Sequence, residues 1–225
     1  MINIVRSQPE PKCLEIEKSK KDGSYACDDV ELRLKNDFHN KCYLCEEKGI
    51  STINIEHFKP HKGNKDLKFD WNNLFWSSGH CNNTKLAKKE FDLILNCTDP
   101  KHKILEMIRF EIKPFPFEEA KITARFDEPI IQNTVMLLQM IYNGSTNHKE
   151  IEGANIRQKL IEEIRDFGVL LSDYFDDTYL EYEKNEIKQR IRRKLSPQSA
   201  FTAFKICIVQ ENNTLLKEFS QFLPQ

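Results

Sequence analysis

Glycine is scarce in this chain: only 7 of its 225 residues are Gly, less than half of the usual share of about 7%. Because tight turns depend on glycine, this scarcity disfavours a fold of many short strands and favours helices. The sequence also lacks any run approaching about 18 apolar residues, which excludes a membrane-spanning helix. Its first residues show no basic segment followed by an apolar one, so we expect no secretory signal peptide.

The cysteine count argues against a small disulfide-bonded scaffold. Seven Cys is an odd number in a chain without an export signal, so we expect reduced thiols or metal ligands and a cytoplasmic location. Cys13, Cys27 and Cys207 are interpreted as free or buried thiols. The hydrophobic share of 39%, with 15 Phe, excludes global disorder, and the length fits one large domain or two small ones.

The net charge of −1 conceals three charged regions. From Lys48 to Lys89 the chain carries eight Lys and three acidic residues, whereas from Glu150 to Glu186 it carries eleven acidic and four basic residues. Five of the seven residues from Lys188 to Lys194 are basic. A near-neutral protein of this kind can still present a basic surface to a phosphate backbone. The run at 188–194 is equally compatible with a partner-protein contact or with ion pairs along a helix.

The hydrophobic pattern predicts an α+β fold that is mostly α. The predicted strands are residues 51–58 and a pair at 107–112 and 120–126. The predicted helices are residues 28–38, 82–95, 129–142, 156–194 with an interruption near 176–177, 197–209 after an N-cap at Ser196, and 213–222, with a capped helical turn at 70–76. We divide the chain into an N-terminal segment and helix (1–40), a module dense in Cys, His, Asn and Lys (41–99), and a mainly helical region (100–225).

The module at 41–99 contains a pair of cysteines with metal-ligand spacing. Cys42-Tyr-Leu-Cys45 is a C-x2-C knuckle, in which two thiolates can hold one zinc ion through a tight turn. Redox pairs share this spacing, but the βαβ pattern that surrounds them is absent here. Cys81 follows at the start of a predicted helix. A knuckle combined with a cysteine at a helix start is typical of a small zinc-centred fold.

Polar residues with catalytic potential lie between the two cysteine elements. His57 ends a predicted strand in the run Ile-Glu-His-Phe-Lys-Pro, and a histidine beside a carboxylate, here Glu56, can act as a general base with an adjacent metal ligand. Asn73-Leu follows, and Asn82-Asn-Thr-Lys comes directly after Cys81. The complete order is C-x2-C, E-H-x2-P, N-L and C-N-x2-K. Each piece alone is a weak signal, whereas the four in this order and spacing are a strong one.

This pattern resembles that of the HNH endonucleases over about residues 40–90. The resemblance implies a ββα-metal finger embedded in, and followed by, a helical scaffold. It implies that His57 is the general base, that Asn73 positions the loop of that base, and that Lys85, at the family's lysine position, offsets phosphate charge. It further implies that Asn82 binds the catalytic cation, Mg²⁺ or Mn²⁺, with Glu56 as a second candidate ligand. The implied activity is metal-dependent hydrolysis of phosphodiester bonds in DNA, or in an RNA such as tRNA.

The surrounding residues are similar to one branch of that family, the PtuB subunits of Septu-type and retron-associated anti-phage systems. The similarity is carried by the runs Asn-Leu-Phe-Trp-Ser-Ser from Asn73, Asn-Cys-Thr-Asp-Pro from Asn96 and Ser-Pro-Gln-Ser-Ala-Phe from Ser196. It implies that the chain is the nuclease effector of a defence complex with an ABC-type ATPase subunit (PtuA-like). In the retron-associated systems, the implied partners include a reverse transcriptase with its RNA and DNA.

The chain departs from the family at Ser78, which stands where a second C-x2-C pair would have its first cysteine. Because a closed structural zinc site has four ligands, the three cysteines Cys42, Cys45 and Cys81 leave one position to fill. The candidates for it are His80, Cys97 and His39. The alternative is a motif without zinc that is held by the packing of Tyr43, Phe75 and Trp76.

Two interpretations of the whole chain stay open. Besides the nuclease, the chain could be a non-catalytic zinc-knuckle adaptor that docks nucleic acid and a partner protein, although an adaptor would need only the metal ligands. We expect residues 40–95 to face nucleic acid and residues after about 125 to dock the ATPase, because the former are basic and the latter acidic. Either a partner covers the apolar stripe of the helical region, or the chain's own helices do; the stripe contains Leu170, Leu171, Tyr174 and Phe175.

Overall fold

The computed structural model describes residues 1–144 and 146–224. Its α-helices are α1 (Lys12–Ser19), α2 (Asp28–Asp37), α3 (Lys65–Lys68), α4 (Gly79–Leu86), α5 (Ile104–Met107), α6 (Pro129–Asn143), α7 (Asn147–Phe175), α8 (Glu181–Leu195), α9 (Thr202–Gln210) and α10 (Asn213–Phe219). Its strands are β1 (Ile53–His57), β2 (Leu74–Ser78), β3 (Ile108–Glu111) and β4 (Lys121–Ala124), and its 3₁₀ helices are η1 (Trp71–Asn73), η2 (Lys89–Asp92) and η3 (Ser220–Phe222). The predicted class, α+β and mostly α, is confirmed, because the strands among the described residues form two small antiparallel sheets and most of the other elements are helices.

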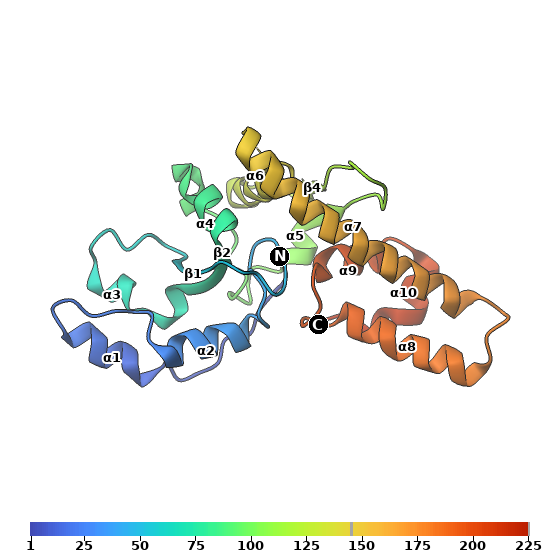
Figure 1. Ribbon diagram of the computed structural model, residues 1–225, viewed down its shortest axis with the longest axis horizontal. Coiled ribbons are helices and arrows are strands. Elements are labelled where there is room, and N and C mark those ends of the chain that lie inside the picture. The colour runs from blue at the N-terminus through green and yellow to red at the C-terminus, as the bar shows by residue number, and fades with distance from the viewer. Residues whose placement is uncertain (145, 225) are drawn as a thin grey trace.

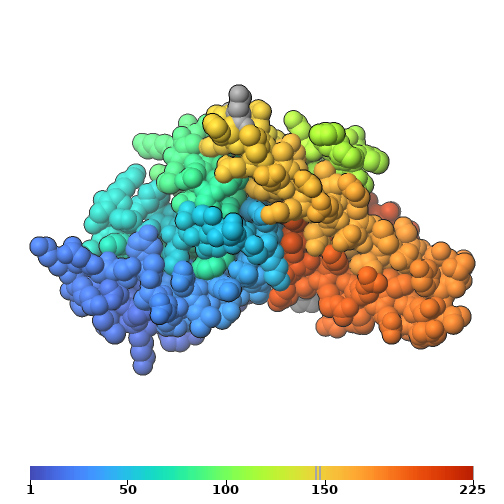
Figure 2. Space-filling view, in the orientation of Figure 1, coloured from blue at the N-terminus to red at the C-terminus, as the bar shows by residue number. Residues whose placement is uncertain are grey.

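The elements form an arch, with α1, α2 and α3 at one end and α8 and α10 at the other (Figure 1). The space-filling view shows a hollow on the lower side, between the N-terminal residues and the C-terminal helices (Figure 2). One large apolar cluster runs through the arch and includes residues from Met1 to Cys207. Within the described ranges, no helix is long and apolar enough to cross a bilayer.

The first sheet carries most residues of the predicted site. β1 and β2 pair with Ile53 opposite Ser78 and with His57 opposite Leu74, and every residue of β2 is buried. Ser78 then begins α4, because its Oγ accepts a hydrogen bond from the N–H of Cys81 at 3.2 Å. Ser78, where the resemblance implies a cysteine, is therefore the N-cap of the helix that carries Cys81.

Several predicted elements are confirmed. α2, α6 and the β3–β4 hairpin lie where the pattern places them, and α6 has Pro129 in its first turn. The long predicted helix is interrupted between α7 and α8, where Asp176 accepts hydrogen bonds from the N–H and the hydroxyl of Thr178. These hydrogen bonds to the Asp176 side chain stabilise a local turn, so the helix ends there.

The predicted helix over 82–95 is wrong beyond Leu86, where α4 ends. The next residues form η2, and α6 supplies partners for their backbone. Asn133 Nδ2 donates to the carbonyls of Glu90 and Leu93 at 3.1 Å, and Thr134 Oγ1 accepts from the N–H of Leu95 at 2.8 Å. A segment whose backbone is bonded by a neighbouring helix needs no helical hydrogen bonds of its own.

The start predicted for the helix at 197–209 is also wrong, because α9 begins at Thr202. Ser196 ends α8 in an extended conformation instead of starting the next helix. The first N–H groups of α9, those of Thr202 and Ala203, bind the carboxylate of Glu46 at 3.0 and 3.2 Å. A carboxylate from the cysteine knuckle thus has the capping role that the pattern assigned to Ser196.

The apolar stripe of α7 packs on the chain's own helices. A second, smaller core cluster lies between α7, α8, α9 and α10. Leu170 is 3% exposed in this cluster, Leu171 and Tyr174 pack against it, and Phe175 is 44% exposed. The structure therefore matches the second of the two predictions for the stripe, and only its last ring remains largely in contact with solvent.

Cys13 and Cys27 form a disulfide, so the expectation that both are free thiols is wrong. Cys13 lies in the first turn of α1 and Cys27 is the N-cap of α2. The loop between the helices leads the chain back to the start of α1. This return brings the two Cα atoms to 6.7 Å across a separation of 14 residues, which a count of cysteines does not reveal. Cys207 is buried and forms no disulfide, as expected.

Candidate metal centre and active site

Three cysteine thiols meet at one point in the core. Cys42 and Cys45 precede β1, and Cys81 lies in the first turn of α4. Their Sγ atoms all lie within 4.8 Å of one another, and all three residues are fully buried. Thiolates are among the preferred ligands of zinc. The cluster could therefore hold a metal ion such as zinc, and the predicted grouping of these cysteines is confirmed.

The cluster favours negative charge on one of its sulfurs. Burial opposes ionisation of Cys42, but hydrogen bonds from the Cys45 and Cys81 thiols and from the backbone N–H of Ser78 bring the pKa of Cys42 well below its usual value. Burial raises the pKa of Cys45 and of Cys81 instead, and the Cys42 sulfur raises both further. Because the core disfavours an isolated charge, a thiolate in this position is well placed to bind a cation.

None of the candidates for a fourth ligand lies in the cluster among the described residues. His80 uses both of its ring nitrogens elsewhere, since Nδ1 lies 2.6 Å from Glu152 Oε2 and Nε2 lies 2.9 Å from the carbonyl of Ile141. Cys97 is buried outside the cluster, and burial raises the pKa of its thiol to about 12. His39, whose backbone is left-handed at φ 55°, also lies outside it. In residues 1–144 and 146–224 the cluster thus has three protein ligands.

His57 lies at the end of β1 with its ring oriented by the backbone. Its Nε2 lies 2.9 Å from the carbonyl of Lys68, and a carbonyl can only accept, so Nε2 carries the proton. Nδ1 is then an acceptor and has no hydrogen bond to any described residue. Burial lowers the pKa of the half-buried ring, which favours its neutral form. A neutral imidazole with one nitrogen held and the other open is the arrangement that a general base requires.

Asn73 clamps the loop that follows His57. Its Oδ1 accepts from the N–H of Lys59 at 2.7 Å, and its Nδ2 donates to the carbonyls of Lys59 at 2.9 Å and Leu67 at 3.0 Å. Its own carbonyl accepts from the N–H of Phe58 at 2.9 Å. These bonds tie together both sides of the loop, which is a placement compatible with the positioning role predicted for Asn73.

Glu56 and Lys85 form a buried ion pair. Because side chains alternate along a strand, Glu56 points to the opposite face of β1 from His57. Its Oε1 lies 2.6 Å from Lys85 Nζ and accepts from the Tyr43 hydroxyl at 3.1 Å, while its Oε2 is buried without a hydrogen-bond partner among the described residues. The structure therefore does not bring the Glu56 carboxylate together with the His57 ring.

Lys85 is 4% exposed and paired with Glu56, which does not favour the predicted role of offsetting phosphate charge by direct contact. α4 turns Lys85 into the interior, where its ammonium donates to the carbonyl of Phe58 at 2.8 Å and lies 3.4 Å from that of His57. Asn82 lies almost one helical turn earlier, is half-buried, and makes no side-chain hydrogen bond among the described residues. Residues three apart share one side of a helix, so Asn82 lies on the same side of α4 as Lys85, nearer its N-terminus.

Two rings that the motif does not contain lie against His57. The ring centroids of Tyr25 and His61 are 4.5 Å and 4.7 Å from that of His57, both in edge-to-face geometry. His61 follows the E-H-x2-P element directly, so proximity in the sequence could have indicated it. Tyr25 lies in the loop between α1 and α2, and no sequence signal links it to His57.

A second buried carboxylate lies in the cysteine knuckle. Glu46 is 1% exposed, its Oε1 lies 2.6 Å from the amino group of Met1, and its Oε2 lies 3.3 Å from Lys41 Nζ. Burial alone would raise its pKa, but the two cations lower the pKa of Glu46 to about 2. Together with its bonds to the first turn of α9, this carboxylate joins three parts of the chain, and no sequence pattern indicates it.

Neither the models of known protein families nor the curated proteins match this chain. A functional conclusion therefore depends on the geometry described above and on the order of the motifs.

Proposed function

We propose that this protein is a metal-dependent HNH endonuclease and that β1, β2 and α4, with the three thiols, form its ββα-metal finger. The observation that carries the proposal is the state of His57, whose ring is held through Nε2 while Nδ1 stays open. Asn73 clamps the loop behind it, as a fixed base requires. The motif order supports the same function. A histidine with a purely structural role is normally hydrogen-bonded through both ring nitrogens when it is buried, so an Nδ1 without a partner among the described residues favours a catalytic role.

In the proposed reaction, Nδ1 of His57 accepts a proton from a water molecule as that water attacks the phosphorus. The Lys68 carbonyl keeps the ring in the required tautomer and stabilises the charge that it gains. A divalent cation such as Mg²⁺ or Mn²⁺ would supply a Lewis acid for the phosphate and the leaving oxygen, with Asn82 as its ligand from this chain. Glu56 is left out of this ligand set because it points into the buried pair with Lys85. The expected products carry a 5′ phosphate and a 3′ hydroxyl.

The three thiols have a structural part in this proposal. Cys42, Cys45 and Cys81 fit one zinc ion, because they converge and one of them is inclined to ionise. Such an ion would link the knuckle to α4 and so, through the contact of Lys85 with Glu56, to the strand that carries His57. Because Ser78 caps α4, the fourth ligand of the zinc ion would be neither Ser78 nor one of the three cysteines.

The nuclease test is a cleavage assay with Mg²⁺ on plasmid DNA, single-stranded DNA and total RNA. Wild type is compared with His57→Ala and with His148→Ala, a matched control at an exposed histidine of α7. We expect wild type and the control to cleave and His57→Ala to lose activity by about 10²- to 10⁴-fold at an unchanged melting temperature. Cleavage by His57→Ala at the wild-type rate would overturn the proposal. Nucleic-acid binding without cleavage by wild type would favour the zinc-knuckle adaptor.

We infer the partners from the resemblance. The chain would act as the nuclease effector of an anti-phage complex with an ABC-type ATPase subunit (PtuA-like), and in retron-associated systems with a reverse transcriptase and its RNA and DNA. The acidic stretch at 150–186 supports docking to a basic surface, since Glu162 and Asp166 are exposed on α7.

The docking test is co-purification with the ATPase. The pair Glu162→Lys and Asp166→Lys should release the partner, whereas the control pair Asp28→Lys and Glu31→Lys, at exposed acidic positions of α2, should not. Equal retention of the ATPase by both pairs would contradict the docking face on α7.

A further inference from the structure

The segment from Lys12 to Cys27, here called the brace segment, packs beside the candidate active site. It contains α1 and the loop that leads to α2, and it lies at the same end of the arch as α3 (Figure 1). Lys18 Nζ pairs with Asp66 of α3 at 2.6 Å, and the ammonium groups of Lys65 and Lys68 donate to carbonyls of the brace segment at 3.0 Å. The segment is thus attached to the helix whose last carbonyl orients His57.

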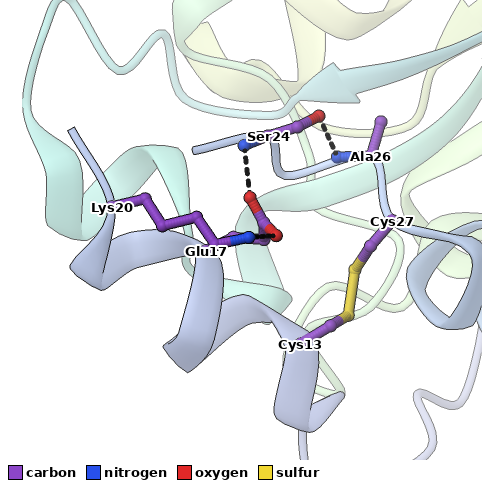
Figure 3. Close-up of a disulfide and its surroundings, with 6 residues drawn as sticks. All are labelled: Cys13, Glu17, Lys20, Ser24, Ala26 and Cys27. Atoms are coloured by element: carbon purple, nitrogen blue, oxygen red, sulfur yellow. Dashed lines mark hydrogen bonds and ion pairs between the residues drawn. A yellow bond between two sulfur atoms is a disulfide. The ribbon is translucent and has the colours of Figure 1, made fainter. Parts of the chain in front are cut away.

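Covalent and polar contacts fix the brace segment internally (Figure 3). The disulfide between Cys13 and Cys27 joins its two ends. Between them, the carboxylate of Glu17 accepts a hydrogen bond from the N–H of Ser24 at 3.0 Å. Gly23 approaches α1 so closely that a Cβ would lie 1.8 Å from the carbonyl oxygen of Glu17. The loop that carries Tyr25 therefore has one defined path.

This path places the Tyr25 ring against His57. Tyr25 is half-buried, and its ring meets that of His57 at an interplanar angle of 71°, with the centroids 4.5 Å apart. The hydrogen bond to Lys68 fixes only one atom of the His57 ring, which could still turn about that bond. Tyr25 on one side and His61 on another restrict this rotation. The Tyr25 hydroxyl has no hydrogen bond among the described residues, so the contact belongs to the ring.

We propose that Tyr25 is a positioning residue for His57 and that the Cys13–Cys27 disulfide holds it in place. The inference rests on the proposed nuclease function. A general base is effective only when its acceptor nitrogen points at the reacting water, and small errors in that direction reduce the rate. Tyr25 therefore acts on the chemical step through His57 and contributes little to substrate affinity.

The kinetic test compares Tyr25→Leu, Tyr25→Phe and Tyr182→Leu, a control at an exposed tyrosine of α8. We expect Tyr25→Leu to lower kcat by about three- to tenfold with KM unchanged, and Tyr25→Phe to restore the wild-type rate because it keeps the ring. An effect on KM alone would make Tyr25 a substrate contact. A lower melting temperature with an unchanged kcat would make it a packing residue. Either result would overturn the proposal.

A second readout does not depend on cleavage. The ring-proton resonances of His57 sense the neighbouring tyrosine ring, so they should shift in Tyr25→Leu and stay in place in Tyr182→Leu. Unshifted resonances in Tyr25→Leu would refute the contact whatever the activity. If the resonances shift in Tyr25→Leu but the wild-type protein cleaves no substrate, the contact between Tyr25 and His57 exists and the nuclease function is refuted. The catalytic role of Tyr25 is then refuted with it.

The role of the disulfide is tested by removing both of its cysteines. Cys13→Ser combined with Cys27→Ser should lower kcat in the same direction as Tyr25→Leu. If the disulfide acts through Tyr25, adding Tyr25→Leu to that pair should lower kcat no further than Tyr25→Leu alone. Losses that multiply in the triple variant would show that the disulfide acts by another route and would overturn this part of the proposal.

Discussion

The two ends of the arch have interiors of different kinds. Around β1, β2 and α4 the interior contains the ion pair of Glu56 with Lys85 and the cluster of three thiols. Between α7, α8, α9 and α10 the interior is apolar, with Phe167 and Phe219 fully buried. Lys194 pairs with Glu163 at the rim of this cluster, where water reaches both side chains, and the buried charge at this end is that of Lys205 in α9, which pairs with the same carboxylate at 3.2 Å.

The difference shows which end of the molecule fixes geometry. A buried charge must keep its partner, and a hydrogen bond has a direction, so polar interiors define the positions of individual atoms. An apolar interior tolerates exchanges of similar volume. We therefore expect the exchange of single atoms to destabilise the end that carries His57. At the helical end, we expect stability to depend on the volume of the side chains.

The largest effect is expected from the exchange of one sulfur atom. Cys81→Ser removes one of the three thiols that we propose to hold a zinc ion, so the protein should lose that ion and its free energy of unfolding should fall by about 5 kcal/mol or more, because metal binding contributes directly to folding. Metal content and thermal melting measure this. Cys207→Ser, at a buried cysteine outside the cluster, is the control and should keep the metal. A full metal content in Cys81→Ser would speak against the site.

The next effect concerns the buried ion pair. Lys85→Met leaves Glu56 without its cation and should lower the free energy of unfolding by about 3–5 kcal/mol in denaturant titrations. Adding Glu56→Gln should restore part of the loss, since the group left in the core is then neutral. Lys89→Met, at an exposed lysine nearby, should change little. A double variant no more stable than Lys85→Met would mean that the unpaired carboxylate is not the cause.

At the helical end, volume should decide the outcome. Leu170→Ala creates a cavity among α7, α8 and α9 and should lower the free energy of unfolding by about 3 kcal/mol. Leu170→Met keeps the volume and should lower it by about 1 kcal/mol or less. Cleavage and metal content should stay unchanged in both. If Leu170→Met were as damaging as Leu170→Ala, the contrast between the two ends would not hold.

The last effect is a pH dependence that is absent at neutral pH, and it concerns Glu46, where the two ends meet. The pKa of Glu46 is about 2 in the folded chain and near 4.5 when unperturbed, so the unfolded chain binds the proton more readily. Its contribution is complete above about pH 4.5 and is lost as the pH falls through about 2, with a loss of about 3 kcal/mol over that window. The free energy of unfolding, plotted against pH, should fall less steeply in that window for Glu46→Gln than for wild type. Identical slopes for wild type and Glu46→Gln would disprove the ion pair.

Local features of the fold could be predicted from the sequence, and features decided by distant contacts could not. The interruption between α7 and α8 was predictable because Asp176 acts on its own neighbours. The start of α9 was not, because its capping carboxylate, Glu46, is 156 residues away from Thr202. The early end of α4 has the same kind of cause, since Asn133 bonds the backbone that follows it.

For the candidate site, the motif order grouped residues correctly but did not give their directions. It brought the three cysteines together and placed Asn73 behind His57, as the structure has them. Strand alternation implied that Glu56 and His57 point to opposite faces, but it could not tell which face is covered. That depends on α4, whose Lys85 turns inward to meet the carboxylate.

Several polar partners of the cysteine knuckle lie in the late part of the chain. The carbonyl of Cys45 accepts from the Tyr142 hydroxyl at 2.6 Å, Lys48 donates to the carbonyl of Gln198 at 3.0 Å, and Glu46 binds the N–H of Ala203. During synthesis on the ribosome, these three contacts therefore cannot form until long after the last motif residue has been added. A growing chain would hold every residue of the proposed nuclease and still lack the contacts that shape its thiol cluster, so that activity would arrive only with the final helices.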